Sequence, residues 1–193
     1  MIWPTKKLGE VHLIGVDHSV QWNRELNESR EFIAFLEKQI LQLNPSLIAE
    51  EFSEQALEWN NIEGTIARDV AVRNKVEHIF CDPSDKEREE IGYPTKKQLR
   101  EKFGVRSSIE GTEEHKKRKL HEITFWPLRE GFWLDKIKKT KSARIIFVCG
   151  SDHLKSFRKL LLQNNYSVAF LYPTNPSRSP AKAGHYGARK LGE

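Results

Sequence analysis

The sequence has 193 residues, of which 38% are hydrophobic and 31% are charged, and its formal net charge is +5. This composition excludes an intrinsically disordered chain, and the length suits a single domain with a substantial buried core. No stretch approaches the roughly 18 consecutive apolar residues of a membrane span, and no export signal is recognised, so we expect a soluble cytoplasmic protein with no membrane partner.

The first half of the chain predicts strands alternating with helices. In chain order we expect a strand over 11–16, a helix over 29–43, a strand over 46–52, a helix over about 64–75 and a strand over 77–83. Ser29 is placed to cap the first helix, and Pro45 lies just beyond its end. Cys81 and Cys149 each end an apolar run, which is typical of reduced buried thiols.

The second half begins with a charged segment over about 84–141, whose pattern predicts helices that form an insertion or cap over the sheet. After it we expect a strand over 143–149, a helix over 153–165 and a strand over 166–172. The alternation predicts an α/β fold, with a mostly parallel central sheet flanked by helices, in one domain over 1–172. Residues 173–193, rich in Pro, Gly, Ser and basic residues, are predicted to form a flexible tail.

A four-residue word, Gly-x-Asp-His, occurs twice, and both copies follow an apolar strand and precede a helix. They span Gly15–His18 and Gly150–His153. Composition alone predicts such a word on the order of 0.01 times. Because the carboxyl ends of parallel strands meet at one edge of a sheet, where ligands of such folds bind, we expect His18 and His153 to share one site.

A pair of carboxylates ends the second predicted strand. Glu50 and Glu51 must face opposite sides of that strand, so only one of them faces the histidines. Two histidines and a glutamate match a first-row divalent metal site, with Asp17 as a further ligand. Manganese, cobalt or iron is then favoured over zinc, because aspartate joins the ligands. The same residues equally suit a metal-free acid–base set, with Asp152 beside the second histidine.

Three further residues enlarge the predicted site. Asp82 follows the third strand and either lines the cleft or simply ends the strand in an Asp-Pro turn. Arg88 and Arg129 are placed to stabilise negative charge on an oxyanion or a phosphate, unless they serve as structural ion-pair partners.

The ordered motifs resemble the TIKI/TraB superfamily, which is also described as erythromycin-esterase-like or ChaN-like. Its hallmark is a pair of G-x-x-H motifs at strand ends with an acidic residue after the second strand, here Gly15–His18, Gly150–His153 and Glu51. Members also tend to carry an arginine before the final motif, which Arg129 matches. The resemblance covers roughly residues 10–172. It implies an α/β fold and activities that range from metal-dependent proteolysis to metal-free macrolide hydrolysis and haem binding.

We therefore expect a hydrolase that acts on an ester, amide or phosphoester bond of a small molecule or peptide. His18, Glu51 and His153 would hold a divalent ion or a polarised water. Glu50 or Asp152 would take a proton, while an arginine steadies the oxyanion.

Two other functions remain open from the sequence. A protein that binds haem or iron without turnover would be coloured when purified. A binding protein for phosphate-rich ligands would use the basic runs at 115–119 and 136–141. Nucleic acid is the less favoured of these ligands, because the sequence has no RNA-binding signature or zinc-finger spacing.

Overall fold

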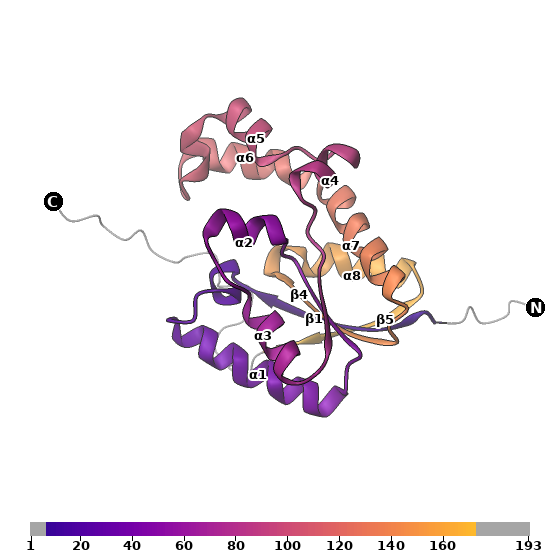
Figure 1. Cartoon of the computed structure of the whole chain (residues 1–193). Helices are drawn as coiled ribbons and strands as arrows, with labels where there is room; N and C mark the ends of the chain where they lie inside the picture. The colour runs from indigo at the N-terminus through magenta and orange to yellow at the C-terminus, as the bar shows by residue number, and fades with distance from the viewer. Residues whose placement is uncertain (1–6, 173–193) are drawn as a thin grey trace, which may run out of the picture.

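The computed structural model describes residues 7–172, which fold around a parallel sheet of five strands (Figure 1). The strands are β1 (Gly9–Val16), β2 (Leu47–Glu50), β3 (Glu77–Phe80), β4 (Arg144–Gly150) and β5 (Tyr166–Leu171). Their order across the sheet is β3-β2-β4-β1-β5, and every pair is parallel. The predicted α/β fold with a parallel sheet is confirmed. The predicted tail at 173–193 lies outside the described residues.

Eight α-helices connect and flank the described strands. They are α1 (Asn27–Leu43), α2 (Glu54–Asn60), α3 (Ile66–Arg73), α4 (Asp85–Glu90), α5 (Lys96–Phe103), α6 (Glu113–Ile123), α7 (Trp126–Thr140) and α8 (Leu154–Gln163). None of them combines the length and the apolar content that a membrane crossing requires.

The start of α1 differs from the prediction. Ser29 is not its N-cap, because the helix begins two residues earlier at Asn27. The Ser29 hydroxyl instead donates a hydrogen bond to the carbonyl of Val20 at 3.1 Å. The serine therefore ties the helix to the turn before it.

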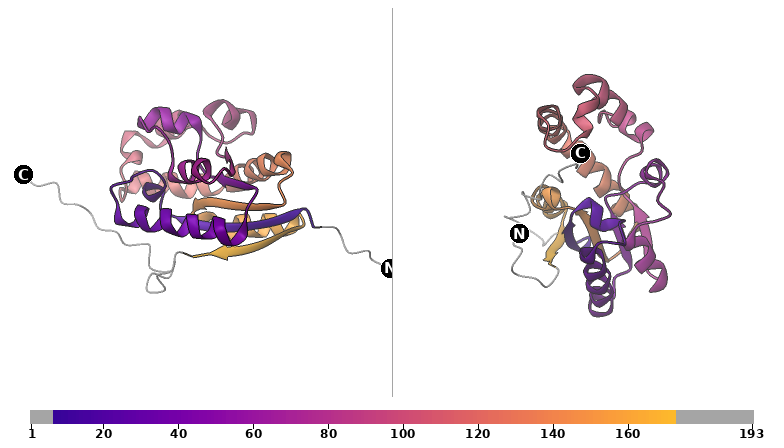
Figure 2. Two further views of the ribbon diagram at one scale, coloured as in Figure 1. Left: turned by 60° about the horizontal axis from the view of Figure 1, so that its bottom comes forward. Right: turned by 90° about the vertical axis from the view of Figure 1, so that its left-hand side faces the viewer.

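Helices cover both faces of the sheet, and strand alternation divides the core accordingly (Figure 2). On β4, Phe147 and Cys149 pack with α7 and α8, whereas Ile146 and Val148 pack with α1 and α3. Successive side chains of a strand face opposite sides, so each strand contributes to both halves of the core. Strands buried on both faces account for the continuous apolar runs in the sequence.

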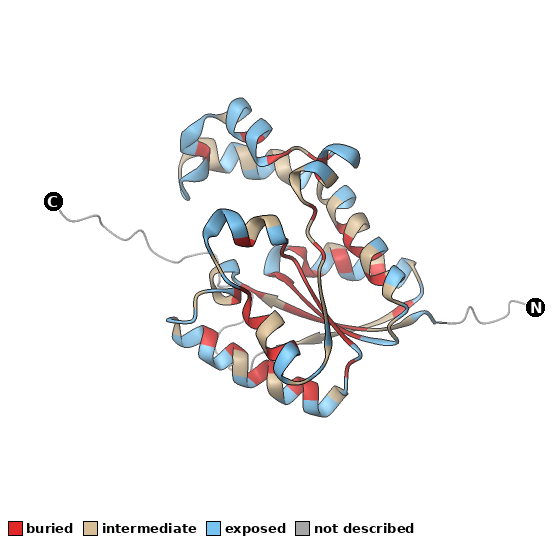
Figure 3. Ribbon diagram, viewed as in Figure 1, coloured by how far each residue is buried: buried red, intermediate tan, exposed pale blue. Residues whose placement is uncertain are grey.

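The charged segment over 84–141 divides into two structural parts. Helices α4, α5 and α6 extend beyond the carboxyl edge of the sheet, and α6 has no buried residue (Figure 3). Helix α7 instead packs on the sheet, with Trp133, Leu134 and Ile137 buried in the core. Only the first part therefore resembles a cap, while α7 is the crossover that returns the chain from β3 to β4.

The first Gly-x-Asp-His glycine is required by packing. A Cβ at Gly15 would lie 2.6 Å from Cδ1 of Leu154 and 3.1 Å from the Cα of Ser151, closer than side chains tolerate. Gly15→Ala should therefore destabilise the fold by about 1–3 kcal/mol through overpacking. Gly131→Ala in α7 is the matched control, because a Cβ there meets nothing within 4 Å and alanine raises helix propensity. Urea denaturation of both variants measures the difference, and equal stabilities would contradict this explanation.

Candidate functional site

The two repeated motifs meet at the carboxyl edge of the sheet. Strands β1 and β4 are neighbours, and their register pairs Val16 with Gly150. The helices that follow them, α1 and α8, pack on opposite faces. Such a reversal is the switch point at which ligands of open α/β sheets bind. The two histidine-bearing turns, His18–Gln21 and Ser151–His153, lie on either side of it.

Glu51 is the carboxylate that reaches both histidines. Its Oε1 lies 3.7 Å from Nε2 of His18 and 3.7 Å from Nε2 of His153. Its Oε2 accepts a hydrogen bond from the backbone N–H of Gly150 at 2.7 Å. The described structure thus brings the two predicted histidines together around the buried carboxylate of the predicted Glu51.

Glu50 lies on the opposite face of β2. Leu47 and Ala49 share the α7 and α8 side with Glu51, so alternation places Glu50 on the α1 and α3 side. There its Oε1 lies 2.7 Å from Nε2 of His78 and accepts a hydrogen bond from the hydroxyl of Thr65. Glu50 is fully buried and is not brought to the histidine cluster.

The glycine of the second motif allows the cluster to close. A Cβ at Gly150 would lie 3.1 Å from Nε2 of His18 and 3.3 Å from Oε2 of Glu51. Any side chain at this position would press on both groups. The glycine therefore lets the imidazole and the carboxylate approach the end of β4 closely.

Arg129 of α7 links the cluster to Asp82. Its Nη1 lies 2.8 Å from Oε1 of Glu51, and its Nε donates to Oδ1 of Asp82 at 2.6 Å. Asp82 also accepts from the indole N–H of Trp133 at 3.3 Å and pairs with Arg88 at 3.3 Å. The predicted Asp82 therefore contacts both predicted arginines, and Arg129 connects it to Glu51.

This buried network shifts two pKa values. Burial acts to raise the pKa of Asp82, but the charges of Arg129 and Arg88 and the hydrogen bonds from Arg129 and Trp133 lower it from 3.8 to about 2. Burial acts to lower the pKa of Arg129, but the carboxylates of Asp82 and Glu51 raise it well above its ordinary value. The arginine thus carries its charge, and Asp82 is ionised at neutral pH.

The two histidines lie in different surroundings. The His18 side chain is 57% exposed, and its Nδ1 contacts the side-chain amide of Gln21 at 3.3 Å. The His153 side chain is 5% exposed, and Trp126 and Trp133 lie with ring centroids 4.2 and 4.9 Å away. Of these two imidazoles, His18 is the one that solvent or a ligand can reach.

The aspartates of the repeated word point away from the cluster. Asp17 caps the turn after β1, where it accepts hydrogen bonds from the backbone and hydroxyl of Ser19 at 2.8 and 2.7 Å. Asp152 is 68% exposed and pairs with Lys119 of α6 at 3.7 Å. Asp17 therefore shapes the turn that presents His18, whereas Asp152 contacts the helix α6.

Glu130 and Ser156 join the site without having been predicted. Oε1 of Glu130 lies 2.8 Å from Nδ1 of His153 and accepts from the hydroxyl of Ser156 at 2.6 Å. The sequence offers one signal for this contact, since Glu130 adjoins Arg129 on the predicted helix. A single charged residue on a helix carries no further indication of what it contacts.

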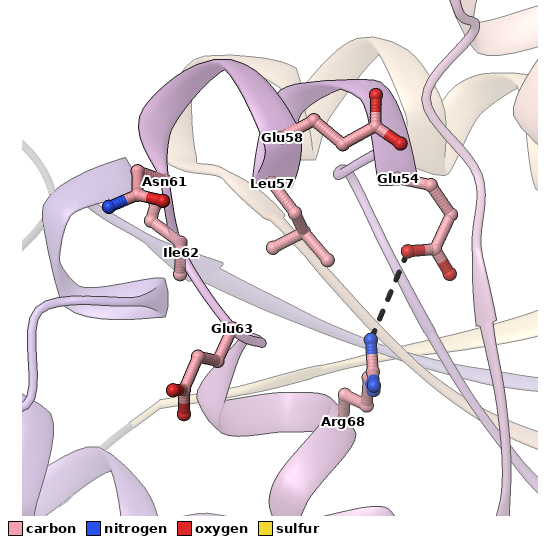
Figure 4. Close-up of a pocket in the computed structure, with 7 residues that line it drawn as sticks. All are labelled: Glu54, Leu57, Glu58, Asn61, Ile62, Glu63 and Arg68. Atoms are coloured by element: carbon pink, nitrogen blue, oxygen red, sulfur yellow. Dashed lines mark ion pairs between the residues drawn. The ribbon is translucent and has the colours of Figure 1, made fainter.

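Two surface hollows lie away from the histidines. One, of about 280 Å³, lies beside α2 and α3 and is lined by Glu54, Leu57, Glu58, Asn61, Ile62, Glu63 and Arg68 (Figure 4). The other, of about 270 Å³, is lined by Glu89, Gly92, Tyr93, Pro94, Gln98 and Phe125. Neither of these two hollows is lined by a residue of the histidine cluster.

Comparisons with known proteins do not add a relative. Neither a family model nor a curated protein nor a solved structure matches this chain significantly. Among residues 7–172, no group of three or more His, Cys, Asp or Glu side chains has an arrangement suited to a metal ion. The fold and site therefore define an α/β protein with a doubly wound parallel sheet and a cluster of two histidines, a glutamate and an arginine at its switch point.

Proposed function

We propose that this protein is a hydrolase of an ester, amide or phosphoester bond in a small molecule or peptide, and that His18 moves the proton. The observation that carries this proposal is the convergence of His18, His153 and Arg129 on the single oxygen Oε1 of Glu51, at 3.7, 3.7 and 2.8 Å. The site lies at the sheet edge where α/β enzymes bind their substrates.

In this proposal His18 takes a proton from the attacking water and returns it to the leaving group. Its exposed ring reaches solvent on one side and faces the Glu51 carboxylate on the other. That carboxylate stabilises the imidazolium formed when the proton is taken. Arg129 pairs with Glu51 and supplies positive charge next to the oxyanion that develops.

The ion pair between Arg129 and Glu51 favours the metal-free mechanism over a metal site. A divalent ion bound by the two histidines and Glu51 would share Oε1 with the guanidinium of Arg129, which lies 2.8 Å away. Two cations at one carboxylate oxygen repel each other strongly in a buried setting. We therefore propose acid–base chemistry by the side chains themselves, with hydrolysis that persists after chelation of metals.

Adjacent carboxylates on opposite faces of β2 provide a matched test. A panel of p-nitrophenyl acetate, butyrate and phosphate serves as the probe, with and without EDTA. Glu51→Gln should lower hydrolysis by about 100-fold or more. Glu50→Gln removes a carboxylate that contacts His78 and Thr65 instead, so its rate per folded molecule should stay close to that of the wild type. Equal losses in both variants would contradict the proposed role of Glu51, and loss of activity with EDTA would contradict the metal-free chemistry.

A further inference from the structure

Glu130 is a buried carboxylate next to His153. Glu130 is 3% exposed and lies on α7 directly after Arg129. Oε1 lies 2.8 Å from Nδ1 of His153 and 2.6 Å from the hydroxyl of Ser156 on α8. Oε1 already accepts from the Ser156 hydroxyl, and as an acceptor it pairs with a donor on the ring, so we assign Nδ1 of the imidazole as the donor in this contact.

The contact of the other ring nitrogen, Nε2, independently places the proton of His153 on Nδ1. Nε2 of His153 lies 3.4 Å from Nη1 of Arg129. A guanidinium carries donors only and is always charged, so Nε2 must be the acceptor there. Both contacts therefore require the neutral imidazole with its proton on Nδ1.

Packing prevents the ring from turning over to exchange these roles. The centroids of Trp126 and Trp133 lie 4.2 and 4.9 Å from that of His153, and the side chain is 5% exposed. A flipped ring would direct its C–H groups toward a buried carboxylate and a buried guanidinium, which loses both hydrogen bonds.

We propose that Glu130 is a positioning residue that fixes His153 as its Nδ1–H tautomer. In that form Nε2 accepts from Arg129 and holds the guanidinium against Glu51. A chain of contacts then runs from Ser156 through Glu130, His153 and Arg129 to Glu51. Its catalytic consequence rests on the proposed hydrolase function: proton transfer is confined to His18, and His153 serves to orient Arg129. The tautomer itself does not depend on that function.

The tautomer is measured directly by two-bond ¹H–¹⁵N NMR on the uniformly labelled full chain. His153→Gln identifies the resonances of this ring by their disappearance. The wild type should show a protonated Nδ1 and an unprotonated Nε2. A protonated Nε2 in the neutral wild-type ring would overturn the proposal, whatever the variants do.

Two substitutions at Glu130 separate positioning from simple packing. Glu130→Gln retains an oxygen that accepts from Nδ1, so it should keep the Nδ1–H tautomer. Glu130→Ala removes the acceptor and should give a mixture in which the Nε2–H form appears. Ser156→Ala is the matched control, because it removes another hydrogen bond to the same oxygen and should leave the tautomer unchanged. A spectrum of Glu130→Ala identical to the wild type contradicts the proposal. If this variant does not fold, the wild-type, Glu130→Gln and Ser156→Ala spectra still decide it.

Hydrolysis of the p-nitrophenyl probes reports the consequence. Loss of the partner that orients a functional histidine should lower kcat by about 10- to 100-fold with a smaller change in KM, and Glu130→Gln should recover most of the rate. If the tautomer changes in Glu130→Ala but neither the wild type nor any variant hydrolyses the probes, the positioning role of Glu130 is supported and the hydrolase function is contradicted. Hydrolysis unaffected by a confirmed tautomer change would contradict the catalytic consequence alone.

Discussion

Arg129→Met should destabilise the protein by about 3–5 kcal/mol, because it leaves the buried Glu51 without its cation and leaves Asp82 with Arg88 alone. Arg129 pairs with Glu51 at 2.8 Å and with Asp82 at 2.6 Å, and these two carboxylates are 0% and 10% exposed. Urea denaturation at pH 7 measures the change in the free energy of unfolding.

The matched control for this substitution is Arg73→Met. Arg73 pairs with Glu37 at 3.0 Å, but the two side chains are 55% and 42% exposed. Exposed pairs of this kind contribute about 0–1 kcal/mol. Similar losses in the two variants would show that the Arg129 network does not hold the fold together.

The same network predicts that the free energy of unfolding decreases at acid pH. The pKa of Asp82 is about 2 in the folded protein against an ordinary 3.8, since its arginine partners outweigh the effect of burial. A lowered folded-state pKa contributes stability above the unfolded value, and this contribution is lost as pH falls through about 2. It amounts to about 2 kcal/mol. Arg129→Met should flatten this dependence, which urea titrations between neutral and acid pH would reveal.

His18→Asn should abolish most of the proposed hydrolysis while leaving the fold almost unchanged. General acid–base groups contribute about 10²- to 10⁴-fold, so a loss of that size in the rate with p-nitrophenyl probes is expected. Because its side chain is 57% exposed, the free energy of unfolding should change by no more than about 0.5 kcal/mol.

His78→Asn is the control for His18→Asn, because it should lower stability rather than hydrolysis. Its side chain is 9% exposed and lies 2.7 Å from Glu50 on the far face of β2. We expect a clear loss of stability with little change in hydrolysis per folded molecule. Loss of hydrolysis in His78→Asn equal to that in His18→Asn would place the chemistry elsewhere.

Much of this arrangement follows from the sequence because the relevant signals are local and periodic. Apolar runs predict the strands, and parallel strands gather their carboxyl ends at one edge, which brings His18 and His153 together. Alternation also requires Glu50 and Glu51 to face opposite sides, but the structure is what places Glu51 on the face of Leu47 and Ala49.

Other features depend on contacts between distant segments, which a single sequence does not display. Asp17 lies beside His18 in the sequence, but its carboxylate caps the following turn by accepting a hydrogen bond from the backbone N–H of Ser19. Glu130 has no periodic signature, yet it meets His153 because α7 and α8 pack on the same face. Ser29 matches the preference for a helix cap, but the turn before α1 binds its hydroxyl instead.

The dipeptide Glu50–Glu51 has a consequence for the molecule as a whole. One carboxylate is tied to Thr65 and His78, the other to Gly150 and Arg129. Two neighbouring residues of the chain thus connect contacts in the two halves of the core. A change in the packing beneath α3 would therefore be passed on to the Glu51 oxygen that faces the two histidines.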